Sequence, residues 1–393
     1  MRINHLEQAP IKGKTVLVRV DYNVPIRKGE VEDNYKIKAS LETIRFLIRN
    51  DCKIVLATHL GRPEGKFNLE YSTRPLVKEL KKLLPNIKIS YLENCIGKDI
   101  LARIEKGVNR EIFLLENLRF YKEEENNDEL FAHSLAALAD VYVNDAFGVS
   151  HRKHASVYAI TEFLPSYAGF LLEKEVDNLS KALNARKPAV WIMGGGKLDK
   201  IELVEQALKK ADYILIGGAL AFAFMKAKGI PIGMSKTDVE SVHSARRILE
   251  RKEARKMILP IDFLATEKMV YSANVKIVKY NEIDNKSICL DLGPETVKLF
   301  KQYLRKAHTI VWNGPLGYYE WAVFAYATKE IGRVLGNLTA VSIVGGGETA
   351  DAMIKFKLEH KVTHVSTGGG ASLEFLAGKK LPGIEALKRG FRK

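Results

Sequence analysis

Side chains that bind anions are concentrated in the first 160 or so residues of the chain. Arg62, Arg119 and Arg152 lie in short polar motifs that follow apolar runs. A guanidinium group holds a phosphate or a carboxylate through two parallel hydrogen bonds. We therefore expect the three arginines to converge on an anionic ligand, although each alone also fits an ordinary surface position. The motifs are Asp21–Pro25, His59–Pro63, Glu116–Phe120 and Asn144–His154.

Glycine clusters replace these motifs after about residue 190. Glycine leaves the backbone open to close approach, and amides at a helix start favour phosphate. One such turn is weak evidence, but four in one region predict a nucleotide site. The clusters follow apolar runs at Gly194–Lys197, Asn313–Gly317, Gly345–Thr349 and Gly368–Ala371.

Two common nucleotide motifs do not fit these glycines. A P-loop requires glycine where Trp191 stands and Ser or Thr where Leu198 stands. The dinucleotide pattern is matched only loosely, by Gly345, Gly347 and Ala350. His151 and His154 have no third metal ligand nearby, so we do not expect a metal there.

Short apolar runs alternate with segments of helical period along the whole chain, which predicts parallel sheets with helical crossovers. For example, Ile37, Leu41, Ile44 and Ile48 share one face of a predicted helix. Expected strands in the first half are Thr15–Val20, Lys53–Thr58, Ile87–Leu92, Glu111–Leu115 and Val141–Asn144. Expected strands in the second half are Ala189–Met193, Tyr213–Ile216, Lys256–Leu259, Thr309–Trp312, Ala340–Val344 and Thr363–Ser366.

The fold class that follows is α/β, with two doubly wound parallel-sheet (Rossmann-like) domains. We place the first domain at 1–167 and the second at 186–375. A continuous amphipathic segment at 168–185 predicts an interdomain helix, with hinges at its ends. We expect the tail, 376–393, to pack back on the first domain.

Composition narrows the class of protein. The chain has 393 residues, is 46% hydrophobic and carries a net charge of +15, so we expect a folded protein with acidic partners. The cations are dispersed and do not form one basic face with aromatic residues, so we expect no nucleic acid partner. Three widely spaced cysteines and the lack of a long apolar segment predict a cytoplasmic protein without a membrane span.

These segments, in this order, resemble the phosphoglycerate kinase family over nearly the full length. The resemblance implies a hinge-bending, glycolytic kinase that passes a phosphoryl group between 1,3-bisphosphoglycerate and ADP, with Mg²⁺ as cofactor. The first domain would bind 3-phosphoglycerate, the second would bind ADP or ATP, and we expect a monomer. An NAD-dependent dehydrogenase and a basic nucleic-acid-binding protein are the alternatives. Further matching segments are Gly169–Glu175, Gly194–Ile201, Asp291–Thr296, Val311–Trp321, Ser342–Ala350 and Ser366–Glu374.

The resemblance also implies roles for individual residues. Those expected at 3-phosphoglycerate are Asp21, Asn23, Lys36, His59, Arg62, Arg119 and Arg152. Those expected at the nucleotide are Gly195, Gly196, Lys197, Lys200, Gly218, Gly293, Asn313, Pro315, Gly317, Glu320, Gly346, Gly347, Glu348 and Thr349. Those expected at the transferring group are Lys36, Lys197, Gly346 and Gly347, with Glu348 as the Mg²⁺ ligand.

The sequence departs from the family pattern at three points. Lys36 stands where the family has an arginine, and lysine lacks the planar fork. The loop from Lys197 to Lys200 is one residue shorter than usual. Glu348 replaces an aspartate, and its longer side chain still offers the oxygen ligands that Mg²⁺ prefers.

Overall fold

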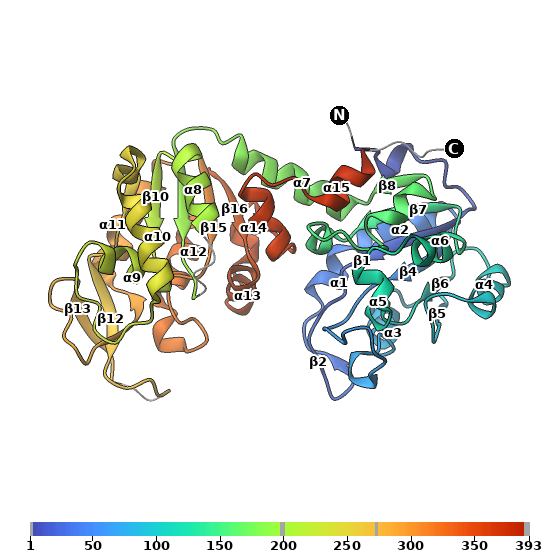
Figure 1. The fold of residues 1–393 in the computed structure, drawn as a ribbon, viewed down its shortest axis with the longest axis horizontal. Coiled ribbons are helices and arrows are strands. Elements are labelled where there is room, and N and C mark those ends of the chain that lie inside the picture. Colours follow the sequence, from blue (N-terminus) through green and yellow to red (C-terminus); the bar gives the residue numbers. More distant parts are fainter. Residues whose placement is uncertain (1–2, 197–200, 272–273, 389–393) are drawn as a thin grey trace. The chain divides into compact units, whose positions relative to one another are not determined.

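The computed structural model describes residues 3–196, 201–271 and 274–388. The chain forms two compact units (Figure 1). Unit 1 comprises Met1–Val176 and Lys380–Lys393, and unit 2 comprises Asp177–Lys379. The division falls within helix α7, Phe170–Leu183, which lies inside the segment where the sequence predicts a long helix.

Unit 1 is built on a six-stranded sheet in the order β5-β6-β4-β1-β7-β8. All neighbouring strands run parallel. The central strand β1 is buried at five of its six positions, as expected for a parallel strand covered on both faces. The strands are β1 Thr15–Val20, β4 Lys53–Ala57, β5 Ile89–Tyr91, β6 Ile112–Leu114, β7 Val141–Asp145 and β8 Ser166–Ala168.

Helices cover this sheet and close the core of unit 1, which includes Val16, Ile44 and Leu80. The C-terminal helix α15 belongs to the same unit and lies beside β8 (Figure 1). Besides α7, the helices are α1 Tyr35–Ala39, α2 Leu41–Arg49, α3 Leu76–Leu83, α4 Lys98–Glu105, α5 Lys122–Glu125, α6 Glu129–Ala136 and α15 Pro382–Leu387.

The predicted helix around residues 37–48 is interrupted at Ser40, which separates α1 from α2. The Ser40 hydroxyl donates to the carbonyl of Ile37 at 3.0 Å and lies 2.8 Å from the hydroxyl of Tyr22. A serine that bonds back to the preceding turn competes with the helical ladder. The apolar face continues across the break, because Ile37, Leu41 and Ile44 are all buried.

Unit 2 contains a second six-stranded parallel sheet, in the order β11-β10-β9-β15-β16-β17. Its core is separate from that of unit 1 and includes Val190, Phe300 and Trp312. The two parallel sheets confirm the predicted fold class. The strands are β9 Ala189–Met193, β10 Tyr213–Ile216, β11 Met257–Ile258, β15 Thr309–Asn313, β16 Val341–Gly345 and β17 His364–Val365.

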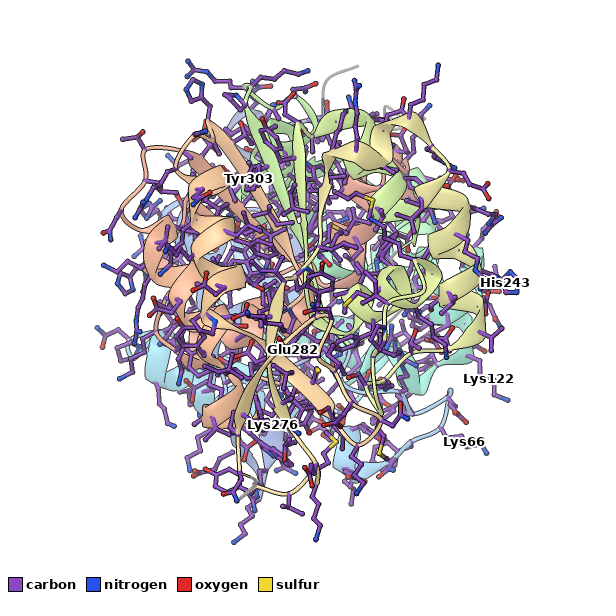
Figure 2. All side chains as sticks on the ribbon, turned by 90° about the vertical axis from the view of Figure 1, so that its left-hand side faces the viewer. Lys66, Lys122, His243, Lys276, Glu282 and Tyr303 are labelled. Atoms are coloured by element: carbon purple, nitrogen blue, oxygen red, sulfur yellow. The ribbon has the colours of Figure 1, made fainter. Side chains whose placement is uncertain are left out.

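The helices of unit 2 pack on this sheet. Tyr303 of α11, labelled in Figure 2, packs against Tyr213 with ring centroids 4.8 Å apart. The helices are α8 Ile201–Lys210, α9 Gly218–Ala227, α10 Val239–Leu249, α11 Pro294–Leu304, α12 Tyr326–Leu335, α13 Gly347–Lys355 and α14 Gly370–Leu376.

Unit 2 also carries a three-stranded antiparallel sheet that the sequence does not predict, in the order β13-β12-β14. Figure 2 shows Lys276 and Glu282 at its outer surface. Its strands are β12 Asp262–Thr266, β13 Lys276–Lys279 and β14 Ile288–Leu292. A two-stranded hairpin in unit 1 was likewise not expected, and its strands are β2 Ile26–Arg27 and β3 Glu30–Val31.

Candidate active site

Four neighbouring parallel strands of unit 1 end at one edge of the sheet, and the predicted anion-binding motifs follow those ends. Parallel strands commonly place ligand-binding loops at this edge. Asp21 and Asn23 follow β1, His59 follows β4, and Arg119 follows β6. Arg152 lies beyond β7 in the segment after the short helix Phe147–Val149.

Lys36 of α1 reaches the end of β1. Its Nζ lies 2.8 Å from Oδ2 of Asp21, whose side chain is largely buried, while that of Lys36 stays partly exposed. Burial raises the pKa of Asp21, but the charge and hydrogen bond of Lys36, the charge of Arg19 and the amide of Asn23 together outweigh it, so the pKa of this carboxyl lies below its usual value. The pair therefore keeps Asp21 ionised and holds an ammonium group at the site.

The turn after β4 is held from two sides. The amide of Gly61 donates to Oδ1 of Asn23 at 2.9 Å, and the carbonyl of Gly61 accepts from Nη1 of Arg119 at 2.9 Å. These bonds bring the loops after β1, β4 and β6 together. Arg62 follows directly in the chain, and its side chain is exposed.

Positive charge accumulates around Arg119, which is 4% exposed. Burial, with the nearby charges of Arg19 and Arg152, lowers the pKa of Arg119 to about 10, so it stays cationic at neutral pH. Nε of Arg119 lies 3.4 Å from Oε1 of Glu125. Burial and these arginines also lower the pKa of His154 to about 3, which leaves that ring neutral.

Sequence reasoning missed Arg19 as a site residue. Arg19 is fully buried in β1, and its Nη2 lies 3.3 Å from Nδ1 of His59. The sequence contained a feature that could have identified it, because Arg19 is the one charged residue in the apolar run Thr15–Val20. A charge in a buried strand needs partners within the fold, and Arg19 has them in Ser156 and Glu124.

The described part of the chain contains no group of three His, Cys, Asp or Glu side chains that could hold a metal ion. His154 instead faces Glu124, with Nδ1 at 3.9 Å from Oε1.

In unit 2 the glycine turns after β9 and β15 line a cavity of about 330 Å³, to which the turn before α13 adds Glu348 and the turn at Gly368–Ala371 adds nothing. Apolar side chains from β12, β14 and α9 form much of its wall, including Phe222, Phe263 and Leu290. A largely apolar cavity with a few polar groups suits a nucleoside. Predicted site residues that line it are Gly195, Gly196, Gly218, Pro315, Gly317, Glu320 and Glu348.

The turns after β9 and β15 pack directly against each other. The amide of Gly195 donates to the carbonyl of Pro315 at 2.7 Å. Gly314 has φ +91°, and a Cβ there would lie 2.0 Å from the carbonyl oxygen of Gly194. The amide of Gly314 donates to Oγ1 of Thr349 at 2.7 Å, so α13 is tied to the same turns.

Helix α13 begins at the third glycine turn. Gly346 has φ +90°, and a Cβ there would lie 2.7 Å from Nδ2 of Asn313. Nδ2 of Asn313 donates to the carbonyl of Gly345 at 2.8 Å, so Asn313 supports the turn from beneath. The first amides of a helix have no acceptor inside it and favour a phosphate. Gly347, Glu348 and Thr349 provide those amides.

Some predicted nucleotide residues lie elsewhere. Gly293 does not line the cavity, since it precedes α11 and its amide donates to the carbonyl of Asp262 at 2.9 Å. Asn313, Gly346, Gly347 and Thr349 are adjacent to the cavity wall through the contacts given above and do not line the cavity itself. Lys197 and Lys200 lie outside the described residues.

Glu348 fits the requirements of a Mg²⁺ ligand. It is half-buried, lines the cavity and has no ion pair or hydrogen bond with any residue that the structure describes. Mg²⁺ in nucleotide sites usually takes one or two carboxylates and completes its shell with phosphates and water. The free carboxylate of Glu348, in the first turn of α13, could therefore serve as the protein ligand of Mg²⁺.

No helix in the described ranges has the length and apolar character needed to cross a membrane.

Comparison with known proteins agrees with the geometry. The family model described as phosphoglycerate kinase matches residues 6–379. A phosphoglycerate kinase of Finegoldia magna is 43% identical over 97% of this chain and 98% of that protein. One from Pelotomaculum thermopropionicum is 42% identical over 96% of this chain and 97% of that protein.

Solved structures give the same result. A phosphoglycerate kinase from Coxiella burnetii matches with a TM-score of 0.87 and 35% identity, covering 98% of this chain and 99% of that one. The enzyme from Pyrococcus horikoshii matches with a TM-score of 0.87 and 31% identity, covering 98% of each chain. The family model, the relatives and the structures do not favour the dehydrogenase or the nucleic-acid alternative. The chain therefore belongs to the phosphoglycerate kinase family, whose members are glycolytic phosphotransferases that act on a carboxyl group.

Proposed function

We propose that this chain transfers a phosphoryl group reversibly between 1,3-bisphosphoglycerate and Mg-ADP, forming 3-phosphoglycerate and Mg-ATP. The proposal assigns the three-carbon substrate to unit 1 and the nucleotide to unit 2. The observation that supports it best is the separation of chemistries: unit 1 gathers cationic side chains at the ends of four strands, and unit 2 has glycine turns around an apolar cavity.

In unit 1, the phosphate of the substrate is held by His59, Arg62, Arg119 and Arg152. Asp21 and Asn23 bind the hydroxyl and carboxyl end, where Lys36 also lies. Arg119 is preoriented by its bond to Gly61, which reduces the entropy lost on binding. Arg62 is exposed and free to close on the ligand.

In unit 2, the base lies against the apolar wall and Glu320 contacts the ribose. The phosphates extend toward the amides of Gly346, Gly347 and Thr349, with Lys197 as an additional contact. Gly195, Gly196, Gly218, Pro315 and Gly317 shape the cavity. The carboxylate of Glu348 holds Mg²⁺, which neutralises charge on the phosphates when it is bound.

In the ATP-forming direction, a terminal oxygen of ADP attacks the phosphorus of the acyl phosphate in line. The bond from phosphorus to the carboxyl oxygen breaks, and the carboxylate departs with the electron pair. No base is required, because neither group must lose a proton. Lys36 and the amides of Gly346 and Gly347 stabilise the charge on the oxygens of the transferring group.

The two ligands must meet for transfer, and acyl phosphates hydrolyse readily. We therefore expect binding of both ligands to bring the units together through bending near the ends of α7, which expels water. We further propose that the enzyme is a monomer. We also propose a cytoplasmic location, because Cys52, Cys95 and Cys289 are all buried free thiols.

The test is a coupled assay of the full chain with 3-phosphoglycerate and Mg-ATP. We expect ADP to form only when both substrates are present, and excess chelator to stop its formation. A fluorescence titration with NADH serves as the comparison for the dehydrogenase alternative. Absence of turnover combined with NADH binding would refute the proposal.

A further inference from the structure

Arg19 is a cation in the interior of unit 1 that the transfer step does not use. It lies in the buried strand β1 and is 0% exposed. Its Nη1 donates to the carbonyl of Val20 at 2.5 Å, and its Nε donates to Oγ of Ser156 at 2.8 Å. An arginine in this position is costly to bury, so its remaining contacts are informative.

Glu124 of α5 balances the charge of Arg19 and helps to fix the orientation of its guanidinium group. The carboxylate is also 0% exposed. Its Oε1 accepts from Oγ of Ser156 at 2.6 Å and lies 3.9 Å from Nη2 of Arg19, while Oε2 accepts from the amide of Ser156 at 2.9 Å. The Ser156 hydroxyl therefore accepts a hydrogen bond from Arg19 and donates one to Glu124. Together these bonds fix the orientation of the guanidinium, the hydroxyl and the carboxylate.

The last contact of the Arg19 guanidinium is to His59, where Nη2 lies 3.3 Å from Nδ1. Guanidinium nitrogens can only donate hydrogen bonds. Nδ1 must therefore accept, which means that it carries no proton and that the proton of a neutral ring resides on Nε2. The ring is 3% exposed, so water does not compete for this contact.

The other charged groups around His59 act in the same direction. Burial lowers the pKa of His59 well below its usual value, and Arg19, Arg119, Lys36 and His154 lower it further. These groups come from β1, α1 and the segments after β6 and β7. Three carboxylates face this cluster: Asp21 lies 2.8 Å from Lys36, Glu125 lies 3.4 Å from Arg119, and Glu124 is engaged by Ser156 and Arg19.

We propose that Arg19, oriented by Glu124 and Ser156, is a positioning residue that fixes His59 as the neutral tautomer protonated on Nε2. This inference rests on the proposed function, in which His59 then offers the bound phosphate an uncharged hydrogen-bond donor. The arginines and Lys36 supply the charge. Binding of 3-phosphoglycerate thereby avoids a group that would otherwise titrate near neutral pH.

The direct test is two-bond ¹H–¹⁵N NMR of the full chain labelled in histidine nitrogens, without substrate. His59→Gln identifies the signals of His59 by their loss. We expect an unprotonated Nδ1 and a protonated Nε2 at every pH between about 5.5 and 8. A proton on Nδ1, or an imidazolium at pH 7, would overturn the inference.

The double variant Arg19→Met with Glu124→Gln removes both buried charges together, which avoids leaving one unpaired. We expect the neutral ring of His59 in this variant to carry its proton on either nitrogen, because Nδ1 no longer faces an obligatory donor. We also expect the KM for 3-phosphoglycerate to rise about tenfold, because the ring no longer presents a fixed donor to the phosphate. An unchanged tautomer in the folded double variant would contradict the proposal.

Glu111→Gln is the matched control, because Glu111 is a buried carboxylate at the opposite end of β6, paired with Lys88 and Ser90. It should leave the tautomer of His59 intact even if stability falls. Arg19→Lys retains a donor and should restore the tautomer. The NMR result is independent of turnover. If the tautomer is correct but 3-phosphoglycerate is not a substrate, the proposed function fails and the role of Arg19 stands.

Discussion

Lys36 stands where the family resemblance implies an arginine. An ammonium group retains the charge of an arginine but donates from one point rather than from a planar fork. The contact with Asp21 at 2.8 Å holds that point at the end of β1. We therefore expect the charge to matter more than the geometry of the donor.

Lys36→Ala should lower kcat by about a hundredfold or more, the cost of removing one donor aimed at a transition-state oxygen. Lys36→Arg should retain most of the activity. Lys38→Ala is the control, since Lys38 lies on the same helix but is exposed. Steady-state kinetics measure kcat for each variant. A loss of kcat below about tenfold in Lys36→Ala would exclude a central role of Lys36 in the transfer step.

At this scale the sequence predicted much of the candidate site and missed its support. The residues after β1, β4 and β6 could be predicted from the sequence, because a polar motif after an apolar run marks a strand end. Arg19 and Glu124 were not identified because their roles depend on which side chains meet in the core. Gly293 shows the converse, since a Cβ there would meet the side chain of Asp262 and the residue does not line the cavity, which its motif did not indicate.

Helix α7 starts on a buried carboxyl group. Oδ1 of Asp145 accepts from the amides of Leu171 and Leu172 at 2.9 and 3.3 Å. Burial raises the pKa of Asp145 to about 7, from the value of 3.8 expected in an unfolded chain. Because the folded state binds this proton more tightly, protonation of Asp145 favours folding.

The stability that this proton provides is fully present below about pH 4 and is lost as the pH rises through 7. The free energy of unfolding of wild type, relative to Asp145→Asn, should therefore fall by about 2–3 kcal/mol between pH 5 and 8. Asparagine keeps an oxygen for the two amides but cannot titrate. Denaturant unfolding of both proteins at several pH values measures this difference, and parallel profiles would rule out the assignment.

The glycine turns of unit 2 depend on close backbone approach. Gly314→Ala would bring a Cβ to 2.0 Å from the carbonyl of Gly194 at a φ of +91°. We expect the substitution to cost about 1–3 kcal/mol of stability and to weaken Mg-ADP binding, since the strained turn must shift. Gly336→Ala is the control, because its Cβ would meet the flexible side chain of Lys361. Calorimetric titration with Mg-ADP should separate the two, and equal affinities would contradict the packing argument.

Length alone did not decide which strands were predictable, because the two-residue edge strands β11 and β17 were expected and the five-residue strands β12 and β14 were not. Every strand of the two parallel sheets except β8 was expected, because burial on both faces produces continuous apolar runs. β8 spans only Ser166–Ala168, and β13 has a lysine at each end and lies at a sheet edge. Neither strand forms a continuous apolar run, so the local sequence carries little signal for them.

The whole molecule consists of two units with separate hydrophobic cores and different ligand chemistries. The division was visible in the sequence because strand–helix alternation occurs twice and the chemistry changes between the halves. The net charge of +15 is consistent with two anionic substrates.

The central claim is that each unit binds one substrate of a single phosphoryl transfer. Its most direct test is the coupled assay with 3-phosphoglycerate and Mg-ATP, applied to Arg62→Ala in unit 1 and Glu320→Ala in unit 2. Both side chains are exposed, so neither change should unfold the chain. We predict that Arg62→Ala raises the KM for 3-phosphoglycerate about tenfold or more and leaves that for ATP unchanged, with the reverse for Glu320→Ala. Absence of transfer in wild type, or an exchange of these two effects, would contradict the account.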